Sequence, residues 1–226
     1  MPDTLSPIAR TPLHEWHAGH GGRFIDRDGW QVVAAYGGVE HEAQAARTGL
    51  GLADVSAFAK ISLRGPGVPS QVLSLSPRGV TPVTDEPALA CRLTDDHLLL
   101  LAATPTATAL NPHLLGFHEG RAVVKTDVTS TYAGFEVIGP RLEEVLCRLT
   151  HLDVRPSALP VNSCAETALA GVEALLVRPG GRSLPGLRIY VAWDLGEYVW
   201  ERIVEAGRDV PITPLGLEAL GLLLRR

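Results

Sequence analysis

The sequence contains two copies of one short pattern, and this internal duplication constrains the fold more than any other feature. Each copy opens with Asp-Val followed by Ser or Thr, continues with a Gly-Pro step and ends with Val-Leu. The copies begin 73 positions apart, and in both the valine follows the aspartate by 18 residues. The Gly-Pro step shifts by one residue, as a bulge or a longer turn would cause. The copies are Asp54-Val55-Ser56, Gly65-Pro66 and Val72-Leu73, and Asp127-Val128-Thr129, Gly139-Pro140 and Val145-Leu146.

Each copy predicts a strand, a turn and a helix. Apolar residues alternate after the aspartate, Gly-Pro interrupts the pattern, and apolar residues then recur at helical spacing. Such a unit cannot bury its apolar face alone, so we expect the copies to pack together and leave a seam where a ligand would bind. The expected fold is one α+β domain over residues 1–226, made of two pseudo-repeats at about 14–115 and 121–226. The clearer helix has Leu142, Val145, Leu146 and Leu149 on one face.

Composition restricts the class of protein and of partner. A chain of 226 residues with 46% hydrophobic residues suits one compact domain. The net charge of −5 offers no basic field for nucleic acid or an anionic membrane, and the aromatic content of 5% provides few stacking surfaces. No apolar run reaches membrane-spanning length. We therefore expect neither a nucleic-acid nor a membrane partner.

The cysteines and the N-terminal residues favour a cytoplasmic protein. Cys91, Cys147 and Cys164 have neither Cys-x-x-Cys nor metal-ligand spacing, so they indicate thiols in a reducing compartment. The first residues contain Asp3 and several prolines and lack a basic stretch followed by an apolar run, so they do not resemble a secretory signal.

Hydrophobic periodicity and turn residues predict the remaining elements. The last expected helix is apolar to its end, so it needs a partner inside this chain or on another one. In the helix at 194–206, the inward residues would be Leu195, Tyr198, Val199, Ile203 and Val204. The expected elements are a helix at 39–50 with Glu40, Glu42 and Arg47 on its polar side, a strand at about 58–64, a helix at about 67–76, a loop or edge strand at 77–87, hairpins at 91–102 and 173–192, and helices at 194–206 and 212–224.

The N-terminal third resembles a known family. Its motifs are Thr11-Pro12-Leu13-His14-Glu15-Trp16-His17, Gly29-Trp30, Tyr36, Val39-Glu40-His41-Glu42, Ala46-Arg47, Gly51-Leu52-Ala53-Asp54-Val55-Ser56 and Gly65-Pro66. In this order they are similar to the opening of the aminomethyltransferase, or T-protein, of the glycine cleavage system. This resemblance implies a duplicated, interlocked α+β domain with tetrahydrofolate between its halves in the catalytic members.

Later segments are also similar to the small gamma subunit of heterotetrameric sarcosine oxidase, from the same superfamily. The resemblance covers nearly the whole chain. We expect the C-terminal barrel domain of the aminomethyltransferases to be missing, and the helix that precedes it in that family has an apolar face here. The segments are Asp127-Val128-Thr129 to Val145-Leu146, Ser163-Cys164-Ala165-Glu166-Thr167, Arg188-Ile189-Tyr190-Val191 and Tyr198-Val199-Trp200.

The resemblance also implies where a folate site would lie, and the sequence departs from the family there. Family enzymes carry a pair of aspartates that aligns with Glu86-Pro87 or, after a one-residue slip, with Asp85-Glu86. Asp85 and Glu86 are therefore candidates for catalysis, and Glu86 for cofactor binding. A second family position is a glutamate that holds the pterin, and Arg188 replaces it here. A guanidinium only donates hydrogen bonds, so it would face the pterin donors with donors of its own. Tetrahydrofolate is a possible cofactor of doubtful affinity.

Other candidate residues have simpler structural interpretations. His14, His17 and His20 are three residues apart, but no fixed carboxylate completes a metal site, so we predict no metal. Asp54 and Asp127 recur with the repeat, and a side chain that caps its own turn explains both better than catalysis.

The sequence leaves three functions open. The first is a non-catalytic or accessory subunit of one-carbon or N-methyl amine metabolism, like the sarcosine oxidase gamma subunit, with partner subunits or self-association through the apolar C-terminal residues. The second is an active tetrahydrofolate-dependent aminomethyl- or methyltransferase in which Glu86 acts as the acid and Arg188 recognises an anionic group. The third, an iron-sulfur repair factor, ranks last because the cysteine motif of that branch is absent.

Overall fold

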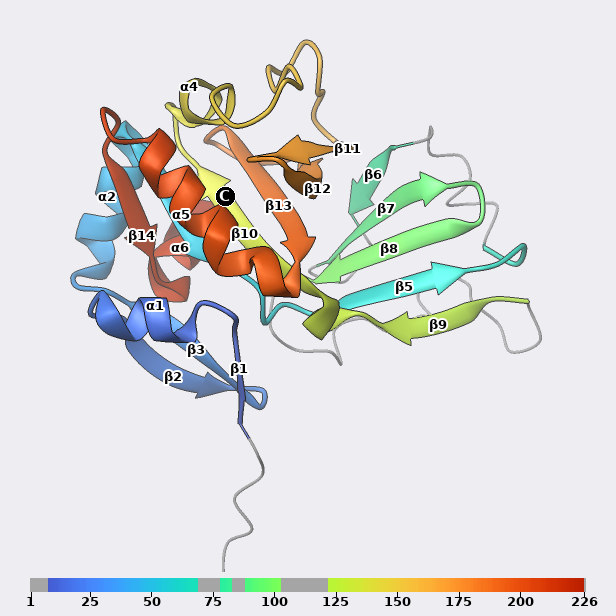
Figure 1. The fold of residues 1–226 in the computed structure, drawn as a ribbon, viewed down its shortest axis with the longest axis horizontal. Helices are drawn as coiled ribbons and strands as arrows, with labels where there is room; N and C mark the ends of the chain where they lie inside the picture. Colours follow the sequence, from blue (N-terminus) through green and yellow to red (C-terminus); the bar gives the residue numbers. More distant parts are fainter. Residues whose placement is uncertain (1–7, 69–77, 83–87, 103–121, 226) are drawn as a thin grey trace, which may run out of the picture.

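Short apolar runs separated by turn residues give this chain three β-sheets. The computed structural model describes residues 8–68, 78–82, 88–102 and 122–225. Within them, the sheets have the strand orders β1-β3-β2, β6-β7-β8-β5-β9 and β11-β12-β13-β10-β4-β14 (Figure 1). The strands are β1 (Ala9–Arg10), β2 (Arg23–Arg27), β3 (Trp30–Ala35), β4 (Leu50–Asp54), β5 (Lys60–Arg64), β6 (Val80–Pro82), β7 (Ala88–Thr94), β8 (His97–Ala102), β9 (Val124–Asp127), β10 (Tyr132–Ile138), β11 (Ser163–Leu169), β12 (Val172–Arg178), β13 (Gly186–Ala192) and β14 (Ile212–Leu215). The helices are α1 (His14–Gly19), α2 (Val39–Thr48), α4 (Leu142–Leu146), α5 (Gly196–Ala206) and α6 (Leu217–Leu224), with 3-10 turns η3 (Thr129–Thr131) and η4 (Trp193–Leu195).

The two larger sheets repeat one strand order, and they exchange a strand. The order β6-β7-β8-β5-β9 corresponds to β11-β12-β13-β10-β4, and β14 extends the second sheet. Strand β4 precedes β5 in the chain but pairs antiparallel with β10, while β9 precedes β10 but pairs antiparallel with β5. The predicted duplicated and interlocked α+β fold is thus confirmed.

The glycines of the two Gly-Pro steps adopt the same backbone conformation. Gly65 has φ +135° and Gly139 has φ +143°, a region that L-residues with a Cβ rarely enter. A Cβ on either glycine would collide with a backbone oxygen, that of Ala122 or that of Gly49. These two oxygens lie just before β9 and β4, so each Gly-Pro step contacts the backbone that leads into the exchanged strand.

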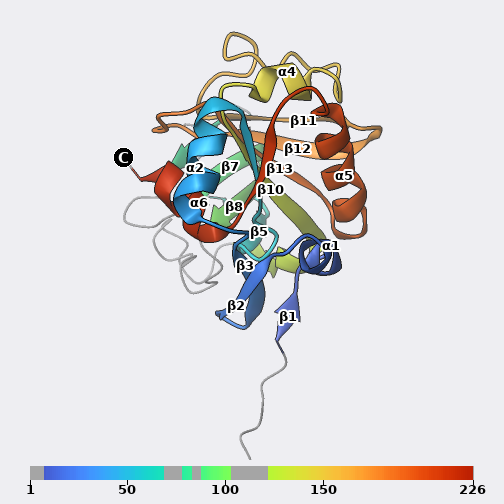
Figure 2. The same cartoon turned by 90° about the vertical axis from the view of Figure 1, so that its left-hand side faces the viewer.

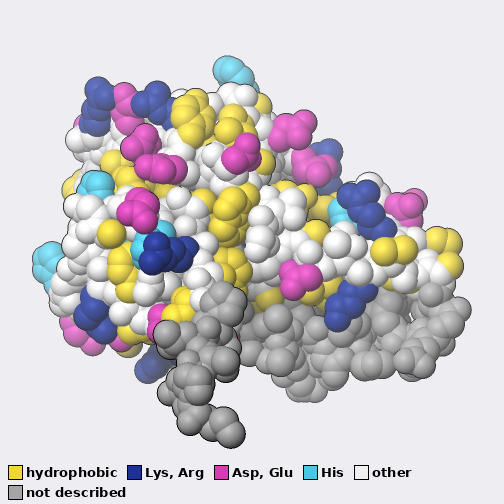
Figure 3. All heavy atoms as spheres, turned by 60° about the horizontal axis from the view of Figure 1, so that its bottom comes forward, with side chains coloured by type: hydrophobic (Ala, Val, Ile, Leu, Met, Phe, Trp, Pro, Cys, Tyr) yellow, Lys and Arg dark blue, Asp and Glu magenta, His cyan; other side chains and the backbone are white. Residues whose placement is uncertain are grey.

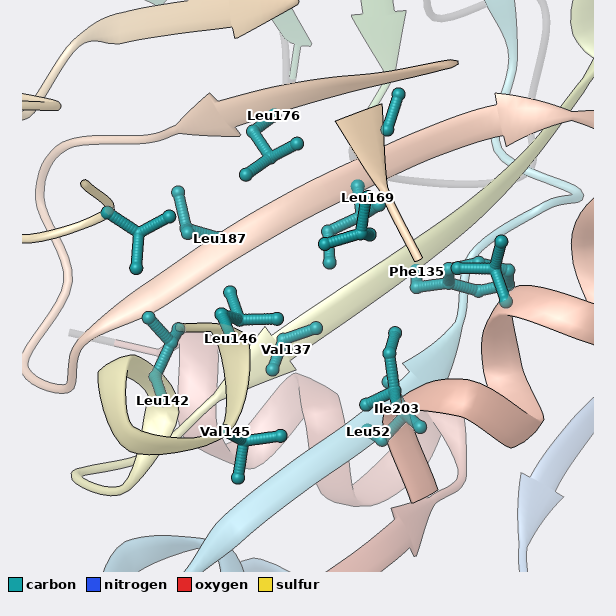
Figure 4. Packing of buried hydrophobic residues seen from close by; sticks show 14 of the residues in the cluster. Leu52, Phe135, Val137, Leu142, Val145, Leu146, Leu169, Leu176, Leu187 and Ile203 are labelled. Carbon is teal, nitrogen blue, oxygen red and sulfur yellow. The ribbon is translucent and has the colours of Figure 1, made fainter. Parts of the chain in front are cut away.

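Helices and the five-stranded sheet cover the six-stranded sheet. One face packs on α4 and α5 in the largest hydrophobic cluster, in which Leu52, Phe135, Val137 and Leu187 meet Leu142 and Ile203 (Figure 4). On the other face, α2 and α6 lie side by side over β4, β10 and β14 (Figure 2). Beside these helices, the same face of β11, β12 and β13 packs against the five-stranded sheet. The seam between the two larger sheets is therefore next to the α2–α6 layer.

The C-terminal segment is not one helix, contrary to the prediction for 212–224. Residues Ile212–Leu215 form β14, which pairs parallel with β4, and α6 begins only at Leu217. Pro214 has no N–H and disfavours a helix interior, and Gly216 precedes the helix. Within α6, Ala219, Leu220 and Leu223 are buried in one cluster with α2. Much of the apolar run thus finds its partner inside this chain.

Helix α5 also differs from its prediction. Tyr198 and Val204 are exposed rather than inward, while Trp200 is fully buried. The buried positions are Gly196, Val199, Trp200 and Ile203, a helical stripe that is rotated from the expected one. The phenol of Tyr198 donates instead to the carbonyl oxygen of Ala170 at 2.9 Å.

The other predicted elements have mixed outcomes. The two hairpins are confirmed as β7–β8 and β12–β13, and the edge strand within 77–87 is β6. Helix α2 ends two residues earlier than predicted, because Leu50 belongs to β4, a strand the sequence did not predict. The expected helix at 67–76 falls almost entirely outside the described residues.

The surface contains both signs of charge. In the face shown in Figure 3, acidic and basic side chains are interspersed around a short stripe of hydrophobic side chains. On this face, the side chains of the described residues form no broad basic patch. No helix of the described ranges is long and apolar enough to cross a membrane.

Candidate functional site

The seam between the two larger sheets contains an apolar part and a charged part. The apolar part joins Val80, Cys91, Leu99 and Leu101 of the five-stranded sheet to a matching set from the six-stranded sheet, Cys164, Leu175, Val177 and Tyr190. The charged part lies on β10 and β13, on the same face of the six-stranded sheet. It contains Arg188, which lies on β13 and which the sequence resemblance assigns to a pterin-binding position.

The Arg188 side chain forms contacts inside the chain and is only 3% exposed. Its Nε donates to Glu136 Oε2 at 2.8 Å, and its Nη1 donates to the carbonyl oxygen of Ala102 at 3.1 Å. Glu136 is its direct neighbour across the β10–β13 ladder. Because Ala102 ends β8, Arg188 also ties the six-stranded sheet to the five-stranded one.

A second guanidinium completes this cluster. Arg182, from the loop between β12 and β13, donates to both oxygens of Glu136, to Oε2 at 2.9 Å. The Glu136 side chain is fully buried. Burial alone would raise the pKa of Glu136, but the charges and hydrogen bonds of Arg182 and Arg188 hold it below its usual value. We call these three residues the seam clamp, a buried carboxylate between two guanidiniums.

The predicted site residues have different outcomes. Asp85 and Glu86 lie outside the described residues. Arg188 is described, and the structure brings it to Glu136.

A buried lysine lies at the junction of the two copies. Lys60, at the start of β5, is 1% exposed, and its Nζ donates to the carbonyl oxygens of Ser56 at 2.8 Å, Phe58 at 2.9 Å and Thr129 at 3.4 Å. Its Nζ also lies 5.8 Å from the centre of the Tyr190 ring. Three acceptors for three N–H groups make Lys60 a structural cross-link between the loop after β4 and the turn after β9.

The ionisation of Lys60 gives a pH prediction. Burial lowers its pKa from 10.5 to about 7, although nearby carboxylates oppose the shift. Between these values the unfolded chain binds a proton that the folded protein releases, so stability should rise with pH in this window. The contribution is at most about 1.4 kcal/mol per pH unit.

Two lysines, Lys60 and Lys125, are present in the whole sequence, so side-chain NMR can follow each one directly. We expect the Lys60 signal to titrate near pH 7. Lys60→Met should remove the rise of stability in this window, while Lys125→Met, in the exposed strand β9, should keep it. A Lys60 signal that titrates above pH 10 would contradict this prediction.

The repeated aspartates cap turns, as predicted. Asp54 Oδ1 accepts from the Ser56 N–H at 2.8 Å, and Asp127 Oδ1 accepts from the Thr129 N–H at 2.9 Å. Asp54 has a further role, because its Oδ2 accepts from His17 Nε2 at 3.1 Å. This buried network fastens α1 to the end of β4.

The three N-terminal histidines do not converge on one point. His17 Nδ1 lies 2.5 Å from the Tyr36 hydroxyl, His20 stacks on Trp16, and His14 packs against the Phe24 ring. Among the described residues, no group of three or more His, Cys, Asp or Glu side chains is placed to hold a metal ion.

Sequence reasoning missed three of the buried charges. Glu136 is a single acid among apolar neighbours in β10, and Lys60 is a single base at the start of β5. For Glu136, an isolated charge in an otherwise apolar strand was the available signal, whereas β5 also contains Ser62 and Arg64. Glu42 was placed on the polar side of its helix, and the structure corrects this: it is 3% exposed. Its carboxylate accepts from the backbone N–H groups of Tyr36, Gly37 and Gly216 at 2.8, 2.9 and 2.9 Å.

Comparison with protein families gives a match over most of the chain. The model of the GCVT N-terminal domain matches residues 13–87 and 75–225. The aminomethyltransferase of Natranaerobius thermophilus is 28% identical over 230 residues, which cover 95% of this chain and 62% of that protein. The aminomethyltransferase of Geobacillus kaustophilus is 29% identical, with 94% and 62% covered. This chain thus spans less than two thirds of the length of these relatives.

Solved structures show the same fold. The glycine cleavage system aminomethyltransferase T from Bartonella henselae superposes with a TM-score of 0.77 at 20% identity, over 96% of this chain and 62% of that chain. A chain of the heterotetrameric sarcosine oxidase from Corynebacterium sp. U-96, determined in complex with pyrrole 2-carboxylate, gives a TM-score of 0.65 at 19% identity. That match covers 89% of this chain and 95% of the other. The family model confirms the resemblance to the aminomethyltransferases, and the sarcosine oxidase chain shares the fold.

Proposed function

Because the chain belongs to the GCVT N-terminal domain family, we propose that it is a non-catalytic or accessory subunit of one-carbon or N-methyl amine metabolism, in the manner of the sarcosine oxidase gamma subunit. Its domain is of the aminomethyltransferase-like, folate-binding type. We propose further that the folate site of this domain is degraded in this chain.

The seam clamp carries this proposal. A carboxylate at the position of Arg188 would accept hydrogen bonds from the pterin ring, whereas a guanidinium offers only donors. In this chain the guanidinium already bonds Glu136 and the carbonyl oxygen of Ala102. A pterin would have to displace a buried ion pair and would then meet mismatched donors, so the residues present here do not fit tetrahydrofolate.

The structural relatives support the assembly part of the proposal. The matched sarcosine oxidase chain is covered over 95% of its length and comes from a heterotetrameric enzyme. By analogy, we expect partner subunits for this chain. Self-association through the outer side of α6 is a weaker expectation, because Leu220 and Leu223 are already buried against α2. We place the protein in the cytoplasm, where Cys91 and Cys164 would remain the free, buried thiols seen here.

Isothermal titration with tetrahydrofolate and its 5-formyl form tests the proposal. We expect no binding at micromolar ligand, while the aminomethyltransferase of Natranaerobius thermophilus serves as the positive control. Micromolar binding to this chain would overturn the proposal. A folate-dependent turnover that Glu86→Gln abolishes would instead establish the active transferase.

A second variant tests the physical reason for the loss. Replacing Arg188 by glutamate together with Glu136 by alanine restores a carboxylate at the family position and removes the internal counter-ion. We expect this double variant to gain affinity for 5-formyltetrahydrofolate relative to the parent. Its thermal unfolding is recorded alongside, so that a failure to fold is distinguished from a failure to bind.

A further inference from the structure

A pocket lies where the C-terminal ends of α2 and α6 meet the loop between β12 and β13. Its volume is about 220 Å³. It is lined by Arg47, Ser183, Leu184, Leu222, Leu223 and Arg225. These residues come from three segments that are distant in sequence, and none of them belongs to the seam clamp.

The lining combines positive charge with an apolar wall. Arg47 makes a hydrogen bond of 3.5 Å to Gln44 in its own helix, and among the described residues neither Arg47 nor Arg225 forms an ion pair. Most other arginines in these ranges do pair with a carboxylate, including Arg23, Arg141 and Arg148. Within the part of the chain that the structure describes, both guanidiniums at the pocket therefore lack a counter-ion.

The apolar wall determines the kind of anion that would fit. Leu223 is 4% exposed, and Leu184 and Leu222 are half-buried, so they offer an aliphatic surface next to the charges. The exposed Ser183 adds a hydroxyl that can donate or accept. An inorganic anion would leave the leucine side chains exposed to water, and an uncharged aliphatic molecule would leave the guanidiniums unpaired.

We propose that this pocket binds a small organic anion with a carboxylate head and a short aliphatic body. The carboxylate would lie between Arg47 and Arg225, since guanidinium groups bind carboxylates in bidentate geometry. The aliphatic body would cover the leucines. The volume is below the roughly 300–1,000 Å³ of sites for drug-sized ligands, so the ligand is a small acid and not a folate-sized cofactor.

Occupancy of the pocket would also affect the seam clamp. Ser183 directly follows Arg182, whose guanidinium bonds the buried Glu136. A ligand held against Ser183 and Leu184 restricts this loop and keeps Arg182 in place. Binding should therefore raise the melting temperature, as any ligand specific for the folded state does.

Amide NMR titration of the full chain with hexanoate tests the proposal. We expect saturable shifts at the amides of Ser183, Leu184 and Leu222, and an affinity that falls as salt is added. Two further probes separate the contributions: 1-hexanol has the body without the charge, and inorganic phosphate has the charge without the body. Both should bind at least about tenfold more weakly, which corresponds to 1.4 kcal/mol. Equal binding of all three probes, or shifts spread over the whole surface, would overturn the proposal.

Two variants and one control complete the test. Arg47→Gln with Arg225→Gln should abolish the hexanoate shifts, and Ser183→Phe should block the pocket with both charges retained. Arg64→Gln, an exposed arginine on β5 without an ion pair in the described residues, should leave them unchanged. The alternative is that the two pocket arginines only stabilise helix C-termini. In that case the double variant loses stability, but hexanoate causes no saturable shift in the parent. This result would reject the proposal.

Discussion

We expect Glu136→Gln to lower the free energy of unfolding by about 3–5 kcal/mol. The glutamine keeps the shape of the side chain but removes its charge, so Arg182 and Arg188 lose their shared counter-ion. The Arg188 side chain is only 3% exposed, and water cannot replace the lost carboxylate there. Urea denaturation followed by circular dichroism measures the change.

Glu144 provides a matched control for Glu136. It also lies between two arginines, Arg141 and Arg148, but its side chain is 38% exposed. Because exposed ion pairs contribute little, Glu144→Gln should cost less than about 1 kcal/mol. Equal effects of the two substitutions would show that burial of the seam clamp has no energetic consequence.

The fall of the free energy of unfolding at acid pH provides a second measure of how much the seam clamp stabilises the fold. The folded-state pKa of Glu136 lies below its ordinary value of 4.5, so the carboxylate stabilises the fold above pH 4.5. This contribution is lost as the pH falls through the lower, folded-state value. The Glu136→Gln variant should therefore lose less stability than the parent between pH 5 and pH 3.

The second large effect concerns Glu42 in α2. We expect Glu42→Ala to cost at least about 3 kcal/mol, because three backbone N–H groups lose a charged acceptor and hydrogen bonds to charged groups contribute about 1.5–3 kcal/mol each. One of these groups, Gly216, connects β14 to α6, and the other two follow β3. The measurement is again urea denaturation.

Hydrogen exchange locates the effect of Glu42→Ala. Relative to the parent, the variant should show a larger increase in exchange rate at the amides of Tyr36, Gly37 and Gly216 than at the amides of the β10–β13 ladder. Glu40→Ala, an exposed acid in the first turn of the same helix, is the control and should change stability by less than about 0.5 kcal/mol. If the two variants are equally stable, the buried contacts of Glu42 are not formed.

The sequence correctly predicted the structural features that depend on a local residue pattern. The repeated Gly-Pro steps are matched by the shared backbone conformation of Gly65 and Gly139, and both hairpins are present. Strand β14 was missed because its pairing with β4 joins segments about 160 residues apart, and no local periodicity reports such a parallel pair. The break in helical pattern at Pro214 and Gly216 was the available signal.

Of the ion pair at the candidate site, the sequence indicated Arg188 but not its partner Glu136. The motif around Arg188 indicated a changed charge at a family position, but its counter-ion Glu136 comes from another strand. That pairing depends on the register of β10 against β13, which a single sequence does not reveal. The same limit applies to Lys60, whose acceptors include Thr129 in the other copy.

The exchange of β4 and β9 has a consequence for the separate halves. A polypeptide carrying only one copy would place its Asp-Val strand beside the wrong neighbour or leave it unpaired, and its sheet would have an open edge. Two such polypeptides could satisfy each other by mutual donation, as swapped dimers do. If the chain is cut between residues 102 and 122, each fragment should therefore be unstable alone, and the two should fold together when mixed. The duplicated chain is equivalent to such a swapped dimer whose two halves are joined by a covalent link.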